Sequence, residues 1–197
     1  MIVSLTGFMG CGKSSVGRRL SELLCCPFMD LDDVIVESAG RSIPEIFATE
    51  GEQAFRQMEL EALRRMVRKC QFRTDVSSTE DITFVLALGG GAVMTKECAE
   101  IVREETCCVY LRASIETLLE HLSEEADGRP MLQSKTALEE ADTSLRGAER
   151  RGNPLQERIA ELMTLRSGTY EKTAHIIVDT DGKSIEAIAS EILSLIR

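Results

Sequence analysis

The stretch that most constrains this chain is Gly7 to Ser14, which reads G-F-M-G-C-G-K-S. This is the G-x-x-x-x-G-K-S pattern of a phosphate-binding loop, in which glycines let main-chain N–H groups approach an oxyanion closely. Residues 2–6 predict a short strand and residues 15–24 an amphipathic helix, which is the context that the motif requires. The positive end of the helix macrodipole then points at the same phosphates. We therefore predict a nucleotide site, with an ordinary glycine-rich turn as the alternative.

Each part of this loop has an expected task. The candidate nucleotide-binding residues are Gly10, Cys11, Gly12, Lys13, Ser14 and Ser15. Lys13 is a point charge for the β- and γ-phosphates, and the Ser14 hydroxyl is a candidate ligand of Mg²⁺.

Composition narrows the class of protein. We expect one domain over residues 1–197, because 43% hydrophobic and 28% charged residues are typical of a soluble globular chain. A net charge of −10 disfavours a binder of bulk nucleic acid. No apolar run is as long as a membrane span, and no leader pattern is visible, so a cytoplasmic protein is expected. The seven cysteines form no C-x-x-C pair, which indicates buried thiols rather than zinc sites or disulfides.

Strand and helix patterns alternate along the whole chain. Strands are predicted at residues 2–6, 25–29, 82–88, 107–111 and 175–179. Helices are predicted at residues 15–24, 34–39, about 52–70, 95–104, 114–122, 155–165 and 184–195. Capping-box patterns at Ser42–Glu45 and Thr49–Glu52 indicate two helix starts in the third helical region. The alternation predicts an α/β fold with a parallel sheet and helices on both faces.

Polar and glycine residues follow two of these strands. Asp30 and Asp32 end the second strand, and Gly89, Gly90 and Gly91 end the third. Ligands of parallel α/β sheets bind outside the carboxyl ends of the strands, so these residues are expected over the nucleotide site. The aspartates have helix N-capping as their alternative, and the glycines a plain flexible turn.

Three further features bear on the site. Arg56 has Glu52 four residues before it and Glu59 three residues after it, which by itself indicates a surface helix ion pair. Residues 123–153 are polar with little apolar periodicity, which is typical of a lid or a disordered segment. The two histidines, His121 and His175, have no partners at metal-ligand spacing.

The motifs taken together resemble the shikimate kinase family. They are the phosphate loop, F-M-D-L-D at 28–32, S-I-P-E-I-F-A-T-E-G-E-Q-A-F-R at 42–56, L-G-G-G-A-V at 88–93 and G-R-P-M-L at 128–132. The match covers residues 1 to about 132 and resumes near Arg166. The resemblance implies a three-layer α/β/α P-loop kinase fold with a five-stranded parallel sheet in the order 2-3-1-4-5. It also implies a substrate-binding segment at about 31–70 and a mobile lid at about 123–153.

The resemblance also implies roles for individual residues. The catalytic residues would be Lys13, Asp32 and Arg129, with Arg129 reaching the transferred phosphate from the lid. One Mg²⁺ per subunit would be held by Ser14 and, through a water, by Asp30. The residues that would bind shikimate are Asp32, Arg56, Gly89, Gly90, Gly91 and Arg166, with Phe47 and Phe55 packing its ring. His121 and Lys183 would lie on the adenine side of the nucleotide.

One stretch leaves a choice between two arginines. The family's R-x-P-L-Y appears here as Arg166-Ser167-Gly168-Thr169-Tyr170, whereas Arg151 precedes a Pro-Leu pair at 154–155. We assign the substrate role to Arg166 because its distance from the last strand matches.

The implied function is transfer of the γ-phosphate of ATP to the 3-hydroxyl of shikimate, in chorismate and aromatic amino-acid synthesis. The implied partners are therefore ATP and shikimate, with no nucleic acid and no membrane, and a monomer is expected. Two alternatives stay open at this point. One is a kinase of another small polyol such as gluconate, and the other is a nucleotide-dependent binding module with weak turnover.

Overall fold

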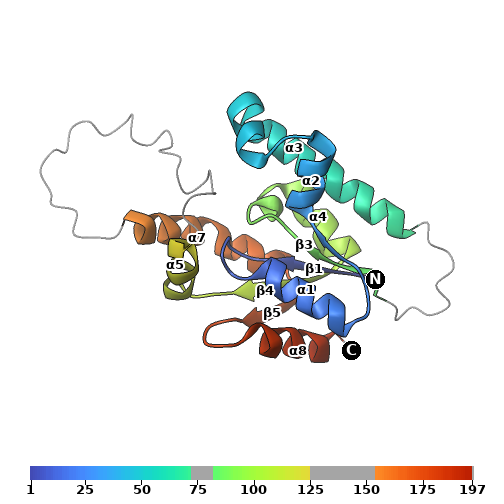
Figure 1. The fold of residues 1–197 in the computed structure, drawn as a ribbon, viewed down its shortest axis with the longest axis vertical. Coiled ribbons are helices and arrows are strands. Elements are labelled where there is room, and N and C mark those ends of the chain that lie inside the picture. Colours follow the sequence, from blue (N-terminus) through green and yellow to red (C-terminus); the bar gives the residue numbers. More distant parts are fainter. Residues whose placement is uncertain (72–81, 125–153, 197) are drawn as a thin grey trace, which may run out of the picture.

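A computed structural model of the chain describes residues 1–71, 82–124 and 154–196. Its centre is a five-stranded sheet (Figure 1). The strands are β1 (Ile2–Thr6), β2 (Phe28–Asp30), β3 (Phe84–Ala87), β4 (Cys107–Arg112) and β5 (Ile176–Asp179). All neighbours pair in parallel in the order β2-β3-β1-β4-β5, which confirms the predicted topology.

Helices cover both faces of this sheet. They are α1 (Lys13–Leu23), α2 (Leu31–Ala39), α3 (Ile43–Gln71), η1 (Ala92–Met94, a 3₁₀ turn), α4 (Lys96–Glu105), α5 (Ile115–Glu124), α7 (Pro154–Thr173) and α8 (Ile185–Leu195). Figure 1 shows α1 and α8 together on one side of the strands and α2, α3 and α4 on the other. The three-layer α/β/α fold is therefore present in the described residues.

Successive side chains of a strand point to opposite faces of the sheet, so an apolar core forms on each face. Val3, Leu5, Val85, Val109 and Val178 face the layer that contains α1 and α8. Ile2, Phe84, Leu86, Cys108 and Tyr110 face the layer that contains α3 and α4. Because the middle strands are buried on both faces, they carry nearly continuous apolar residues.

Local capping sets where several helices begin. Ser42 and Glu45 form the predicted capping box, in which the Ser42 N–H donates to Glu45 Oε2 at 2.8 Å. The predicted second capping device at Thr49 is wrong, because the Thr49 hydroxyl donates back to the Glu45 carbonyl at 2.8 Å. Helix α3 is nevertheless interrupted two residues later at Gly51, whose φ of 81° and ψ of 177° are not helical. Only glycine adopts such a conformation readily.

Some element boundaries differ from the prediction. Strand β2 begins at Phe28 rather than residue 25, because the chain is still leaving α1 there: the Cys26 N–H donates to the Ser21 carbonyl at 3.0 Å, and Cys25 has a φ of 51°. The helix predicted at 155–165 continues to Thr173, through Gly168. The proposed lid segment falls almost entirely outside the described residues, and Arg129 lies there.

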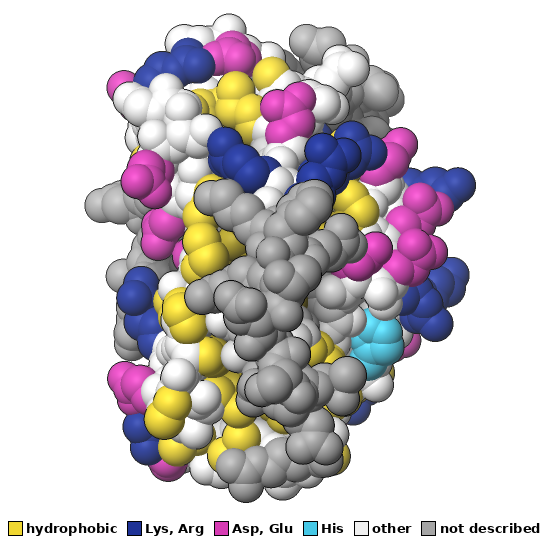
Figure 2. Space-filling model, turned by 90° about the vertical axis from the view of Figure 1, so that its right-hand side faces the viewer, with side chains coloured by type: hydrophobic (Ala, Val, Ile, Leu, Met, Phe, Trp, Pro, Cys, Tyr) yellow, Lys and Arg dark blue, Asp and Glu magenta, His cyan; other side chains and the backbone are white. Residues whose placement is uncertain are grey.

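The described surface mixes charges. On the face in Figure 2, acidic and basic side chains lie next to one another around hydrophobic ones. Among the described residues no helix is long and apolar enough to cross a membrane. The six described cysteines are free thiols, and Cys11, Cys98 and Cys108 are buried as predicted, whereas Cys25 is exposed.

Candidate active site

A cavity of about 840 Å³ lies at the carboxyl ends of the strands. Residues that follow β1, β2, β3 and β5 contribute to its wall, and α3, α5 and α7 complete it. The lining contains these predicted site residues: Gly10, Cys11, Gly12, Lys13, Ser14, Ser15, Asp30, Asp32, Phe47, Phe55, Arg56, Gly89, Gly90, Gly91, His121, Arg166 and Lys183. The structure therefore brings together every predicted site residue that it describes.

The phosphate loop has the backbone form that its glycines allow. Gly10 and Gly12 have φ values of 81° and 87°, in the left-handed region, and Gly12 is the N-cap of α1. The Lys13 ammonium lies across the loop and donates to the carbonyls of Gly7 and Phe8 at 3.0 and 2.9 Å. The loop thus directs the N-terminus of α1 and one cation into the cavity.

Ser14 and Asp30 form an oxygen pair beside the loop. The Ser14 hydroxyl donates to Asp30 Oδ2 at 2.7 Å. The other carboxylate oxygen of Asp30 accepts the Asp32 N–H at 3.1 Å and caps α2. Asp30 therefore caps the N-terminus of α2, the role that the sequence left open as an alternative. It also presents an oxygen at the site.

Asp32 and Glu59 each have a buried carboxylate oxygen, Oδ1 and Oε1, without a hydrogen-bond partner among the described residues. Burial raises the pKa of Asp32 to about 6, and the neighbouring Asp30 charge adds to this effect while Lys13 opposes it. Burial also raises the pKa of Glu59 to about 7, opposed by Arg56. Perturbed carboxyl groups in a cavity indicate a functional site.

Arg56 forms the ion pairs that its helical spacing predicts, but it is not a surface residue. Its Nη1 lies 2.5 Å from Glu59 Oε2, and its Nη2 lies 3.0 Å from Glu52 Oε1. Only 18% of its side chain is exposed, and the Glu59 side chain is 1% exposed. Two carboxylates therefore hold the guanidinium in one place on the cavity wall.

The three glycines after β3 are explained by close packing, since none of them has a positive φ. A Cβ on Gly89 would lie 2.8 Å from both Asp32 Oδ1 and Glu59 Oε1. One on Gly90 would lie 3.2 Å from the Met9 nitrogen, and one on Gly91 would lie 2.5 Å from Arg56 Nη2. Each glycine thus makes room for a different part of the site, which a plain flexible turn would not require.

Arg166 reaches the cavity from α7. Its residue exposure is 7%, and its guanidinium lies 5.9 Å from the centre of the Phe8 ring. Among the described residues no carboxylate pairs with it in an ion pair. Nearby, the Phe47 and Phe55 rings pack with their centres 4.9 Å apart. This wall therefore combines an aromatic surface with a cation that has no carboxylate partner within the described ranges.

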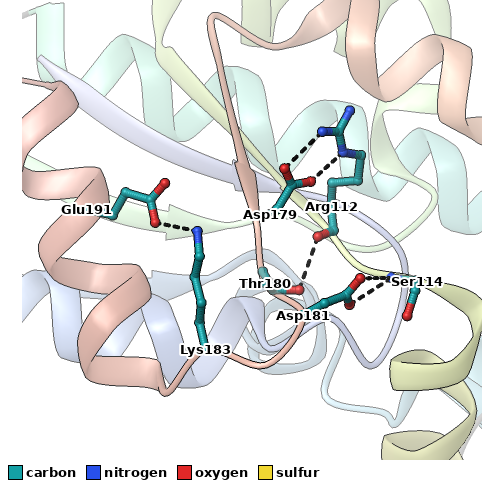
Figure 3. Close-up of polar contacts among 7 residues, drawn as sticks. All are labelled: Arg112, Ser114, Asp179, Thr180, Asp181, Lys183 and Glu191. Carbon is teal, nitrogen blue, oxygen red and sulfur yellow. Dashed lines mark hydrogen bonds and ion pairs between the residues drawn. The ribbon is translucent and has the colours of Figure 1, made fainter.

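The loop after β5 lines another side of the cavity through Thr180 and Lys183. Figure 3 shows the polar contacts that hold this loop. Thr180 donates to the Arg112 carbonyl from its N–H at 2.9 Å and from its hydroxyl at 3.1 Å. Asp181 accepts the Ser114 N–H at 2.9 Å, and Lys183 pairs with Glu191 at 2.6 Å. These contacts fix the loop against the ends of β4 and α8.

His121 adds a contact from α5. Its Nδ1 lies 2.7 Å from the Gly10 carbonyl oxygen, which can only accept, so Nδ1 is the donor of this hydrogen bond. The imidazole therefore lies directly beside the phosphate loop.

Comparison with known proteins identifies the family. The family model described as shikimate kinase matches residues 9–197. The chain belongs to the shikimate kinase family. The shikimate kinase of Thermus thermophilus is 40% identical over 191 residues, which are 97% of this chain and 87% of that protein. The shikimate kinase of Geobacter sulfurreducens is 40% identical over 195 residues, which are 99% of this chain and 90% of that protein.

Solved structures agree with this assignment. A shikimate kinase from Acinetobacter baumannii in complex with shikimate superimposes with a TM-score of 0.79 at 30% identity, covering 99% of this chain and 92% of the other. A gluconokinase from Sinorhizobium meliloti gives a TM-score of 0.51 at 15% identity, a likeness that shows the fold alone.

Residues that the sequence did not single out also line the shikimate kinase cavity. They include Ile43, Ser184, Ile185 and Ile188. Their apolar or small side chains carry no chemical signal, and only the fold places them at the site. Tyr170, which the sequence marked only as the last residue of a motif, contacts the glycine loop, which is formed by Gly89, Gly90 and Gly91.

Proposed function

We propose that this chain transfers the γ-phosphate of ATP to the 3-hydroxyl of shikimate, giving shikimate 3-phosphate and ADP. In the cell this would be a step in chorismate and aromatic amino-acid synthesis. Membership of the shikimate kinase family supports the proposal. The observation that carries it is the single cavity in which a phosphate loop faces Asp32, Arg56, Arg166 and the glycine loop.

The phosphate side supplies positioning and charge. Backbone N–H groups at the start of α1 and the Lys13 ammonium bind the β- and γ-phosphates. Because phosphoryl transfer passes through a loose transition state, neutralising charge and aligning the two substrates provide most of the rate. His121 and Lys183 then border the nucleotide on its base side.

The Ser14–Asp30 pair suits a magnesium ion. A hydroxyl and a carboxylate 2.7 Å apart are hard oxygen donors, which Mg²⁺ prefers alongside phosphate oxygens. We assign one Mg²⁺ per subunit to this pair, with Asp30 contacting it through water. When bound, the ion would offset the negative charge of the phosphates.

The acceptor side matches a polyhydroxylated monocarboxylic acid. Asp32 accepts a hydrogen bond from the attacking hydroxyl and orients it, a contact that is strongest when the carboxylate is ionised. Arg56 and Arg166 bind the carboxylate, since a planar guanidinium pairs with a carboxylate through two hydrogen bonds. Gly89, Gly90 and Gly91 border the acceptor, and Phe47 and Phe55 pack against its ring.

Three further assignments complete the proposal. Residues 1–197 are one kinase domain, with a substrate-binding segment at about 31–70 and a lid at about 123–153. Arg129 in that lid contacts the transferred phosphate, and lid closure excludes water that would compete as acceptor. We assign the protein to the cytoplasm as a monomer that binds neither nucleic acid nor membrane.

A coupled assay of ADP release tests the activity. We expect ADP to form with ATP, Mg²⁺ and shikimate, and not with quinate or gluconate in place of shikimate. The Lys13→Ala variant should lose turnover while keeping a normal melting curve, because its side chain faces the phosphates rather than the core. Equal ADP release with and without shikimate would reject the proposal, as would a preference for gluconate.

A further inference from the structure

Tyr170 makes a contact that the proposed mechanism does not use. It lies on α7 with 0% exposure, and its hydroxyl donates to the carbonyl of Gly90. The two residues are 80 positions apart in the chain. The hydrogen bond therefore joins α7 directly to the glycine loop.

Gly90 is the point where the two substrate sides of the cavity meet. A Cβ on Gly90 would lie 3.2 Å from the Met9 nitrogen and 3.7 Å from the Gly7 carbonyl oxygen. The glycine loop thus packs against the phosphate loop on one side and is held by Tyr170 through its carbonyl. A displacement of Gly90 would change the distance between acceptor and phosphates.

Arg166 precedes Tyr170 by one helical turn on α7, so both side chains lie on the same face of the helix. The Tyr170 ring is fixed by stacking on Tyr110 of β4, with ring centres 5.2 Å apart. Burial raises the pKa of the Tyr170 hydroxyl, opposed by the Arg166 guanidinium, so the hydroxyl stays protonated and can donate near neutral pH.

We infer that Tyr170 is a positioning residue for acceptor binding, which keeps the Arg166 guanidinium and the Gly90 backbone at a fixed separation. This inference rests on the proposed function, since it assigns both groups to the acceptor side. The carboxylate that Arg166 binds and the ring that the glycine loop borders are parts of the same rigid acceptor molecule. A change in the separation of their binding groups therefore weakens acceptor binding without touching the nucleotide.

The Tyr170→Phe variant tests the inference. It removes only the hydroxyl and leaves the Gly90 carbonyl without its donor. We expect the shikimate KM to rise by about tenfold, which corresponds to about 1.4 kcal/mol. The ATP KM should stay within about twofold, because the phosphate loop keeps its own contacts.

Tyr110→Phe is the matched control, since it removes the same group from the stacked partner and leaves the Tyr170–Gly90 bond in place. We expect its shikimate KM to stay within about twofold of the wild type. In a double-mutant cycle, Tyr170→Phe combined with Arg166→Ala should raise the shikimate KM by less than the product of the two single effects.

The melting temperature and the two KM values distinguish a positioning role of Tyr170 from a purely structural one. A lower melting temperature with an unchanged shikimate KM would mean that Tyr170 only stabilises the fold, which overturns the inference. Equal increases in both KM values would also overturn it. If the wild type itself does not turn over shikimate, the proposed function fails, and direct binding of shikimate to wild type and Tyr170→Phe, measured by calorimetry, still tests the positioning role.

Discussion

Asp32 on α2 and Glu59 on α3 bring two carboxylate oxygens, neither with a hydrogen-bond partner in the described part of the chain, to the same small space beside Gly89. Each oxygen lies 2.8 Å from the position that a Cβ on this glycine would take. Burial raises the pKa of both groups, and the negative charge of Asp32 raises the pKa of Glu59 further. The acceptor side of the site is therefore built around a space in which a methyl group does not fit.

Gly89→Ala should consequently disable the site. The new methyl group would push on two buried carboxylates, and overpacking of this kind costs about 1–3 kcal/mol. We expect shikimate-dependent turnover to fall at least about tenfold, as a displaced Asp32 no longer orients the acceptor. Steady-state kinetics and a melting curve measure the two effects.

Gly168→Ala provides the contrast within the same protein. No atom lies within 4 Å of a Cβ at this helical position in α7. Replacing a glycine by alanine inside a helix gains roughly 0.5–1 kcal/mol, so the melting temperature should rise. A loss of stability in Gly168→Ala, or normal kinetics in Gly89→Ala, would contradict this account of the glycines.

The pKa of Asp32 predicts opposite pH trends for activity and stability. A carboxyl group whose pKa is raised from 3.8 to about 6 stabilises the folded state at low pH, and this contribution is lost as the pH rises through about 6. Activity needs the ionised form, so kcat/KM for shikimate should fall below about pH 6.

Asp32→Asn separates Asp32 from other titrating groups. Its stability relative to the wild type should increase as the pH is raised from 4 to 7, because the amide does not ionise. Its residual kcat/KM should lack the acidic limb near pH 6. A limb that persists unchanged would point to another group, with Glu59 and its pKa of about 7 as the first candidate.

Arg56→Lys should distinguish acceptor binding from simple helix pairing. The change keeps the charge but loses the planar fork, and a charge-assisted contact of this kind is worth roughly 1.5–3 kcal/mol. We expect the shikimate KM to rise about ten- to a hundredfold, with the ATP KM unchanged. Arg41→Lys serves as the control, since Arg41 pairs with Glu50 outside this cavity and its exchange should alter neither KM.

Arg166→Ala should raise the shikimate KM at least tenfold, because it removes a nearly buried cation of the cavity wall that we propose binds the substrate carboxylate. Arg151, the alternative from the Pro-Leu spelling, lies outside the described residues. Arg151→Ala should leave the shikimate KM within about twofold, since the substrate role is assigned to Arg166. If instead the Arg151 variant loses affinity and the Arg166 variant does not, the assignment of the substrate arginine is wrong.

Site residues that belong to a short sequence motif were predictable from the sequence. Gly10, Gly12 and Lys13 have a fixed spacing that implies a backbone form, and Asp30 follows an apolar strand whose end the topology places at the site. The same alternation of strands and helices predicted the parallel sheet. In these cases a short pattern determines both structure and position.

Contacts over long sequence distances were not predictable in this way. The bond from Tyr170 to Gly90 depends on how α7 packs, and no pattern in either segment encodes it. Thr49 lies in a sequence pattern typical of a helix N-cap, but its hydroxyl donates instead to the Glu45 carbonyl in the preceding turn of α3. Arg56 had the spacing of a surface pair, and its side-chain exposure of only 18% results from the packing of the folded chain and is not encoded in that spacing.

The interruption of α3 at Gly51 sets the angle between two helical segments that both line the cavity. Phe47 lies before the interruption, whereas Phe55 and Arg56 lie after it. The backbone of Gly51 is not helical, so the φ and ψ angles of this one residue set the direction in which the second segment continues from the first. The placement of Phe47 relative to Arg56, which Glu59 holds by an ion pair, therefore depends on a conformation that only glycine adopts readily.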